Sequence, residues 1–246
     1  MRHLIDDIRA YWDEDAATYD LASHHRPRSP FVMAAWTAAL DQLLPPPPAR
    51  VLDCGAGTGF LSLIAARLGH RVTALDLSTA MLEHLQRANS AEGLDIQIVE
   101  GPADQPTGEF DTVMERHLLW TLPDPEGSLR AWRDVAPDGT LVLVEAVWGP
   151  SDPLEQVKMR VRRQLRRLRG GSPEHHAEYP HDLRAALPLG RGPDPSTLVE
   201  LVASAGWRRT KIVRLADVEW AERIDLPMPE RLVGVAPRFA LTASSR

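Results

Sequence analysis

The stretch VLDCGAGTGF, residues 51–60, decides the fold of this 246-residue chain. An apolar segment ends in the acid Asp53, and three glycines follow at alternate positions before a helical pattern begins at residue 60. Gly55 lets the chain leave a strand in a conformation closed to residues with a β-carbon, and Gly57 leaves no side chain between backbone and ligand. Gly59 lets the following helix pack closely against a sheet. The stretch therefore predicts a strand, a ligand-binding turn and a helix.

Strand and helix patterns alternate outward from this turn. The apolar or alternating segments predict strands at 50–53, 71–76, 96–100, 110–115, 140–147, 207–215 and, after a proline-rich loop, 239–242. The helical segments lie at 60–68, 78–91, 124–136 and 195–205. This alternation is typical of an α/β protein with a doubly wound, mostly parallel sheet, here of seven strands.

The chain reads as a single domain, 1–246, with four parts. Residues 1–44 are expected to form an N-terminal helical cap, in which Ile5, Ile8 and Trp12 recur at helical spacing. Four prolines at 45–48 form a stiff spacer before the core, 49–147. The alternation stops at Gly149, so 150–192 is expected to be a lid or substrate insertion at the carboxyl ends of the strands. A C-terminal helix and strands complete the domain over 193–246.

Composition limits the class of protein. The apolar share is 43% and the charged share is 25%, values of an ordinary folded domain. A single cysteine, Cys54, excludes an internal disulfide and a multi-cysteine zinc site, and it favours a reducing, cytoplasmic setting. No apolar run is long enough to span a membrane, and the N-terminal residues lack the apolar core of a signal peptide. A net charge of −6 argues against a general nucleic-acid binder.

The glycine spacing and two acids indicate the ligand. A dinucleotide turn, G-x-G-x-x-G, would need glycine at position 60, which is Phe60. A carboxylate at Asp53 would repel a pyrophosphate and attract an ammonium group, whereas Asp76 at the end of the next strand can accept both hydroxyls of a ribose. S-adenosylmethionine has both a positive group and a ribose. The alternatives are a structural turn without ligand, and Asp76 as a turn or N-cap residue before Ser78.

Four segments carry a resemblance to a known family. They are YWDEDAATYD at 11–20, VLDCGAGTGF at 51–60, ALDLSTAML at 74–82 and FDTVMERHLLWTLPDPEGSLRAWRDVAPDGTLVLVE at 110–145. The sequence resembles a class I, Rossmann-like S-adenosylmethionine-dependent methyltransferase of the bacterial small-molecule, secondary-metabolism type. After about residue 150 the resemblance is one of architecture only.

The resemblance implies a set of cofactor-binding residues. Asp53, Gly55 and Gly57 would hold the methionine part, Asp76 the ribose, and Leu77 and Met81 the adenine; Arg116 and His117 would lie beside the methionine or the methyl group, and Tyr11 and Tyr19 in helices closing over the cofactor. The family's Gly-Asp-Ala segment here reads Gly101-Pro102-Ala103-Asp104, so proline replaces the adenine-binding aspartate. Asp104 is expected to take over this contact, beside Ala103.

Histidine is the best-placed base if the acceptor arrives protonated. The candidates are His117, after the fourth strand, and His24 and His25, in the loop after the first helix. Each has a structural alternative, a buried hydrogen-bonded ring for His117 and a solvated loop for the other two.

Other side chains have less defined roles. Glu145 is a second candidate base or an orienting group, and Trp120 and Trp148 would line an apolar pocket or belong to the core. His175, His176 and His181 lack the paired carboxylates of a metal site, so no metal is expected.

The predicted function is methyl transfer to an oxygen or nitrogen, with carbon as a third option, of a small metabolite such as a natural-product intermediate. The product would be S-adenosyl-L-homocysteine, and the protein a monomer or homodimer without membrane or nucleic-acid partners. Two alternatives remain. One is an RNA or protein methyltransferase that docks through the arginine-rich segment 158–169. The alternative interpretation of this segment is a solvated helix face. The other is a module that binds the cofactor without transferring its methyl group.

Overall fold

A seven-stranded sheet forms the centre of the protein. The computed structural model describes residues 2–22, 25–146, 157–158, 160–162, 164–165, 179–190, 192 and 194–246. The strands are β1 (Arg50–Cys54), β2 (Arg71–Asp76), β3 (Gln97–Glu100), β4 (Thr112–Arg116), β5 (Thr140–Ala146), β6 (Arg208–Arg214) and β7 (Arg238–Ser244). Their order is β3-β2-β1-β4-β5-β7-β6. The first five run parallel, and β7 lies antiparallel between β5 and β6.

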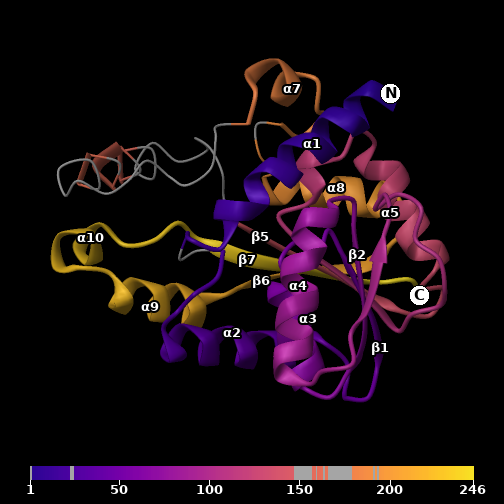
Figure 1. Ribbon diagram of the computed structural model, residues 1–246, viewed down its shortest axis with the longest axis horizontal. Coiled ribbons are helices and arrows are strands. Elements are labelled where there is room, and N and C mark those ends of the chain that lie inside the picture. The colour runs from indigo at the N-terminus through magenta and orange to yellow at the C-terminus, as the bar shows by residue number, and fades with distance from the viewer. Residues whose placement is uncertain are drawn as a thin grey trace.

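Helices cover both faces of this sheet, which explains why the central strands are apolar on both sides. The α-helices are α1 (Arg2–Tyr19), α2 (Pro30–Leu43), α3 (Phe60–Arg67), α4 (Thr79–Glu92), α5 (Pro125–Asp134), α7 (His181–Ala185), α8 (Pro195–Ser204), α9 (Ala216–Asp225) and α10 (Met228–Val233), and η1 (Leu119–Thr121) is a short 3-10 helix. One core joins α2, α3, α4 and α9 to one face, and the other joins α5 and α8 to the opposite face. Figure 1 shows α2 and α9 on one side of the strands and α8 on the other.

Local sequence sets several helix ends. The Ser78 hydroxyl accepts a hydrogen bond from the Met81 N–H at the start of α4, and Gly93 ends that helix with a left-handed φ of 64°. Asp124 caps α5 by accepting from the Gly127 N–H, with Pro125 in the first turn. These caps place the strand ends and helix starts on one edge of the sheet.

The predicted α/β class and seven-stranded, mostly parallel sheet are confirmed. The proline-rich loop expected before the last strand was wrong, because α9 and α10 occupy much of it. Val218 and Ala221 of α9 are buried against the core, and Pro229 lies in the first turn of α10, where a missing N–H costs no hydrogen bond. The prolines there mark the start of α10 and do not indicate a loop.

The N-terminal segment divides into two helices with different roles. α1 packs on α4, whereas α2 packs on α3 and α9. Val32, Trp36 and Leu40 bury one side of α2 in the core. α2 is thus largely a core helix, and the N-terminal cap expected over 1–44 stays a prediction.

A third apolar cluster fixes the segment around α7 to α1. Tyr179, Leu183 and Leu187 pack with Ile8 and Trp120. Much of the expected insertion, including 150–156 and 166–178, lies outside the described residues, so the lid stays a prediction. Among the helices that the structure describes, none is long and apolar enough to cross a membrane.

Candidate functional site

A cavity opens at the carboxyl ends of β1, β2 and β4, between the glycine turn and α1. It encloses about 1120 Å³, including the space at its open mouth. Pockets that bury a small ligand commonly have volumes of about 300–1,000 Å³. The described lining residues are Ile5, Ile8, Trp12, Tyr19, Gly55, Gly57, Asp76, Leu77, Met81, Pro102, Ala103, Asp104, Arg116, His117, Leu118, Thr121, Leu122, Pro123, Asp124 and Ser128.

The three glycines of the turn serve different purposes. All have positive φ, 65° at Gly55, 55° at Gly57 and 88° at Gly59. A β-carbon at Gly55 would lie 2.6 Å from Leu118, and one at Gly59 would lie 2.2 Å from Leu85. A β-carbon at Gly57 would have no atom within 4 Å, and Gly57 lines the cavity. Gly55 and Gly59 therefore permit packing, whereas Gly57 keeps space open for a ligand.

Asp76 ties the turn to β2 and also lines the cavity. Its Oδ2 accepts from the Gly57 N–H at 2.7 Å, and its Oδ1 accepts from the Ser78 N–H at 2.8 Å. Burial raises the pKa of this carboxyl, while the backbone donors oppose the rise. The turn role weighed from sequence is thus real, and a carboxylate oxygen with two lone pairs retains capacity for a ligand hydroxyl.

A second, smaller cavity of about 320 Å³, open space included, shares Tyr19, Gly55, Gly57 and Arg116 with the larger one. Asp53 and Arg116 both line it. The Asp53 carboxylate accepts a 2.6 Å hydrogen bond from Ser62, and burial raises its pKa to about 7. One acid and one guanidinium on the same small cavity match the ammonium and carboxylate of an amino acid.

The Arg116 guanidinium lies over two aromatic rings. Its central carbon is 4.1 Å from the centre of the Phe60 ring and 5.4 Å from that of Trp36. Burial lowers its pKa to about 10, so it stays protonated at neutral pH. The stacking fixes the plane of the guanidinium beside the turn.

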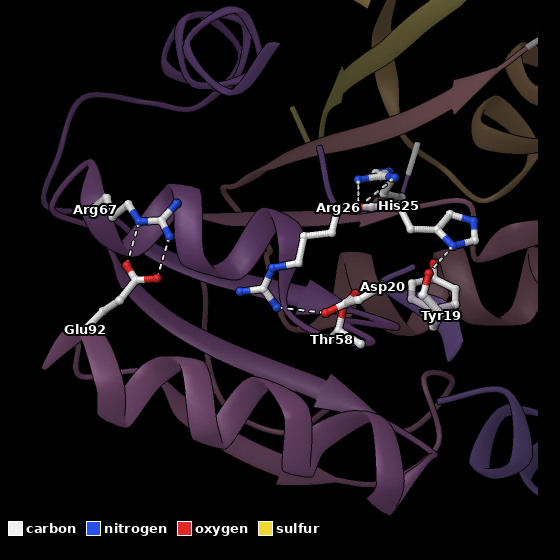
Figure 2. Close-up of polar contacts among 8 residues, drawn as sticks. Tyr19, Asp20, His25, Arg26, Thr58, Arg67 and Glu92 are labelled. Carbon is white, nitrogen blue, oxygen red and sulfur yellow. Dashed lines mark hydrogen bonds and ion pairs between the residues drawn. The ribbon is translucent and has the colours of Figure 1, made fainter. Parts of the chain in front are cut away.

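The segment after α1 closes over the glycine turn (Figure 2). Asp20 accepts from the Thr58 hydroxyl at 2.7 Å and from Arg26 at 2.8 Å. The His25 ring stacks on Tyr19 with centres 3.9 Å apart, and its Nδ1 lies 2.9 Å from the Tyr19 carbonyl oxygen. Tyr19 and His25 both line the smaller cavity, so α1 and its loop form the roof of the site.

His117 directly follows β4 and has a left-handed conformation, with φ of 59°. Its Nδ1 is 2.8 Å from Oε2 of Glu145 on β5. The Glu115 carboxylate accepts from the Leu118 N–H at 2.7 Å and thereby holds the chain around His117. Both glutamates are fully buried.

Leu77, between β2 and α4, and Met81 of α4 line the far end of the larger cavity together with the 102–104 segment after β3. The Trp132 indole N–H donates to the Ala103 carbonyl oxygen at 2.6 Å and fixes that segment. Asp104 lines the cavity there. This end of the cavity offers two apolar side chains and one carboxylate to a planar nucleobase.

The structure gathers most of the predicted site residues on the two cavities. The larger one has Tyr19, Gly55, Gly57, Asp76, Leu77, Met81, Ala103, Asp104, Arg116 and His117, and the smaller one adds Asp53 and His25. Tyr11 is not among the described lining residues and its ring packs 4.5 Å from that of Tyr179, so its contact with the cofactor stays a prediction. His24, like Trp148, His175 and His176, lies outside the described residues. Trp120 is buried in the aromatic cluster with Tyr179, 5.0 Å between ring centres.

Sequence reasoning missed part of the lining. Ile5, Ile8 and Trp12 were taken only as evidence for a helix, although a stripe on one face of α1 had to cover something. Thr121 to Asp124 belong to the segment that carries the family resemblance, but no site role was assigned to them. Among the residues that the structure describes, no group of three His, Cys, Asp or Glu side chains is placed to hold a metal ion.

Known proteins resemble this chain in sequence and fold. Residues 52–143 match the family model described as a methyltransferase domain. A relative is a ubiquinone biosynthesis O-methyltransferase of Xanthomonas campestris pv. campestris (strain B100), 37% identical over 138 residues, which are 54% of this chain and 54% of the relative. The chain thus spans about half the length of the curated relatives it matches.

Two solved structures share the fold. Magnesium protoporphyrin IX methyltransferase from Synechocystis PCC 6803 with bound SAH has a TM-score of 0.59 and 16% identity, covering 96% of this chain and 98% of that one. The cyclase SpnF has a TM-score of 0.57 and 16% identity, covering 85% of this chain and 80% of that one. Residues 52–143 of this chain thus match a methyltransferase domain, and the chain shares the fold of a methyltransferase that binds SAH.

Proposed function

We propose that the chain binds S-adenosylmethionine across both cavities and transfers its methyl group to an oxygen or nitrogen of a small molecule. The observation that carries this proposal is that Asp53 and Arg116 both line the smaller cavity, which shares Gly57 with the larger one. An amino-acid group would sit between this acid and this guanidinium. The adenosine would then extend past Asp76 toward Leu77 and Met81 in the larger cavity.

The fit of the cofactor is supported by shape as well as charge. The missing side chain at Gly57 leaves open the space that a β-carbon would fill. Asp76 offers a carboxylate to the ribose hydroxyls, and Asp104 offers one to the adenine amino group in place of the aspartate that Pro102 replaces. A turn with a purely structural role would require neither this open space at Gly57 nor carboxylates beside it.

When bound, S-adenosylmethionine supplies a methyl group on a positively charged sulfur. The chain's own residues then need to bind, align and exclude water. α1 covers the site through Ile8 and Trp12, and the Tyr19–His25 stack closes its methionine end. His117 also lines the larger cavity, and the product released would be S-adenosyl-L-homocysteine.

An oxygen acceptor is favoured by the relatives, which are named ubiquinone biosynthesis O-methyltransferases. The match covers only 54% of each chain, so a natural-product intermediate remains our proposal for the acceptor. The arginine-rich segment supports a macromolecular substrate less well than its charge suggests. Arg162 donates to the carbonyl oxygens of Gly234 and Val235 at 2.6 and 2.9 Å, so it stabilises the end of α10.

Cofactor binding without methyl transfer is the second candidate, because the cyclase SpnF has this fold. Fold alone does not decide chemistry. Turnover decides between the two: radioactive methyl groups should pass from the cofactor to a small molecule in a screen of candidate hydroxyl and amine compounds. Salt-insensitive turnover would exclude a nucleic-acid substrate, since phosphate contacts give steep salt dependence.

Isothermal calorimetry tests the cofactor site itself. S-adenosyl-L-homocysteine should bind, and NADH should not. Arg116→Met should weaken binding by roughly tenfold or more, because a hydrogen bond to a charged group contributes about 1.5–3 kcal/mol. Arg50→Met is the matched control, since Arg50 pairs with Glu109 and Asp111 at the opposite end of β1. Binding of NADH without S-adenosyl-L-homocysteine, or equal losses in the two variants, would refute the proposed site.

A further inference from the structure

His117 and Glu145 form a pair in which only one partner reaches the cavity. The Nδ1 of His117 lies 2.8 Å from Oε2 of Glu145, and the two side chains are 15% and 0% exposed. His117 lines the larger cavity, whereas Glu145 is not among the described residues that line either cavity. Glu145 can therefore act on a bound molecule only through the histidine ring.

The sheet holds this pair rigidly. The His117 N–H donates to the Val144 carbonyl oxygen at 3.2 Å, which places the ring beside the next residue of β5. Glu115 accepts from the Leu118 N–H on the other side, so the backbone around His117 is held from both directions. A non-glycine residue with φ of 59° is strained, and it persists where surrounding contacts compensate.

We propose that Glu145 is a positioning residue that keeps the hydrogen of the His117 ring on Nδ1, so that Nε2 faces the larger cavity as the acceptor for the proton of a substrate hydroxyl. This inference rests on the proposed function and narrows the acceptor to a protonated oxygen nucleophile. An amine that arrives as a free base would need no such proton acceptor at the moment of attack. A carboxylate beneath a catalytic histidine sets its tautomer in the same way in hydrolase triads.

The step balances without another reactant besides S-adenosylmethionine. The O–H bond of the acceptor breaks and its proton passes to Nε2 of His117. The oxygen lone pair forms the new O–C bond to the methyl group, and the C–S bond breaks with its electron pair going to sulfur. The charge lost by the sulfonium appears on the imidazolium, next to the Glu145 carboxylate that stabilises it.

The protonation of Glu145 controls this arrangement. Burial and the neighbouring Glu115 raise the pKa of Glu145 well above its ordinary value, while Arg116 opposes the rise. On β7 the partner of Glu145 in the sheet is the uncharged Phe239. When Glu145 carries a proton, Oε2 donates to Nδ1, and Nε2 then presents a hydrogen to the cavity. His117 cannot accept a proton in that form. Turnover should therefore fall as the pH decreases, and this fall should begin at a pH above the range in which an exposed carboxyl titrates.

The tautomer is measurable without cofactor. Nitrogen-15 NMR of selectively labelled wild-type protein reports which ring nitrogen of His117 carries the hydrogen, with His117→Gln used to assign the signals. Nδ1 should carry it at the pH of turnover, and the hydrogen should move to Nε2 as the pH falls. In Glu145→Gln the preference for Nδ1 should be lost, since an amide can donate as well as accept.

Kinetics supply the second readout. Glu145→Gln should lower kcat by about 100- to 10,000-fold, with the KM of the acceptor and the affinity for S-adenosyl-L-homocysteine changed by less than about threefold. The acid limb of the pH profile should shift, because protonation of Glu145 no longer contributes to it. Thr140→Val is the matched control, because it removes the 2.8 Å Thr112–Thr140 hydrogen bond from the other end of β5 and should spare kcat.

Two results would overturn the inference. One is a hydrogen on Nε2 of wild-type His117 at the pH of full turnover. The other is a folded Glu145→Gln with unchanged kcat and pH profile. If that variant does not fold, the wild-type tautomer still decides. Failure of wild-type protein to bind S-adenosyl-L-homocysteine would refute the proposed function instead, and the tautomer measurement separates the two failures.

Discussion

The Oδ2 of Asp76 accepts a 2.7 Å hydrogen bond from the backbone N–H of Gly57. The carboxylate at the end of β2 therefore holds the glycine turn that follows β1. Both residues line the larger cavity, so the contact that shapes the turn also places a carboxylate beside any ligand on it. The same atoms therefore shape the turn and face the ligand, and variants can separate these two roles.

Gly57→Ala should harm binding more than folding. An alanine β-carbon there meets no protein atom within 4 Å, so the stability cost should be the left-handed strain, about 1–2 kcal/mol. The methyl group would occupy ligand space and weaken S-adenosyl-L-homocysteine binding by roughly tenfold or more. Gly59→Ala is the comparison, because its β-carbon would lie 2.2 Å from Leu85. Gly59→Ala should lose more stability in urea unfolding; the reverse order would contradict this account.

Asp76→Ala should weaken S-adenosyl-L-homocysteine binding measured by calorimetry. Each ribose hydroxyl bound to the carboxylate contributes at most about 1.5–3 kcal/mol, or roughly 10- to 150-fold in affinity. Adenine and ribose-free fragments, which do not use the carboxylate, should bind with the smaller loss that comes from a loosened turn. An affinity for S-adenosyl-L-homocysteine equal to that of wild type would show that Asp76 is a turn residue only.

Asp20→Ala should speed cofactor dissociation several-fold. Asp20 is the acceptor for both Thr58 of the turn and Arg26 of the loop, so its loss releases the roof from the floor of the smaller cavity. Figure 2 also shows the control, the Arg67–Glu92 pair, with hydrogen bonds of 2.6 and 2.7 Å. Glu92→Ala removes a similar pair away from both cavities. Stopped-flow displacement of a fluorescent ligand measures both rates, and equal rates would exclude a role for the Asp20 contacts in holding the ligand.

Asp53→Asn should make stability less dependent on pH. Burial raises the pKa of Asp53 from 3.8 to about 7 in the folded protein, so the folded state holds a proton that the unfolded state loses. Folded stability from this group is therefore full below pH 3.8 and is lost as the pH rises to about 7 and beyond. The full shift corresponds to roughly 4 kcal/mol as an upper bound.

Urea unfolding of wild type and Asp53→Asn at pH 5 and pH 8 measures the difference, because all other groups are common to both. The wild-type protein should lose more stability between the two values. If both lose the same amount, Asp53 has an ordinary pKa in the folded state.

Much of the fold could be predicted from local patterns. The turn 51–60, the capped helix after Ser78 and the apolar β5 segment each carry their own signal, because φ preferences, caps and burial are properties of short stretches. The region of α9 and α10 could not be predicted as well. The prolines at 227, 229 and 237 look like loop signals in sequence, and only the packing of Val218 and Ala221 on the core shows that a helix precedes them.

The sequence by itself determined the ligand class, since the glycine spacing and the acids Asp53 and Asp76 lie within two strand ends that follow one another along the chain. The tertiary structure alone decided which histidine is backed by a carboxylate. His117 and Glu145 are 28 residues apart, and nothing in either local pattern indicates the other. Parallel pairing of β4 with β5 brings their carboxyl ends together, and burial between helices removes the water that would otherwise solvate Glu145. A hydrogen bond of this kind depends on strand order, which emerges only when the whole sheet has assembled.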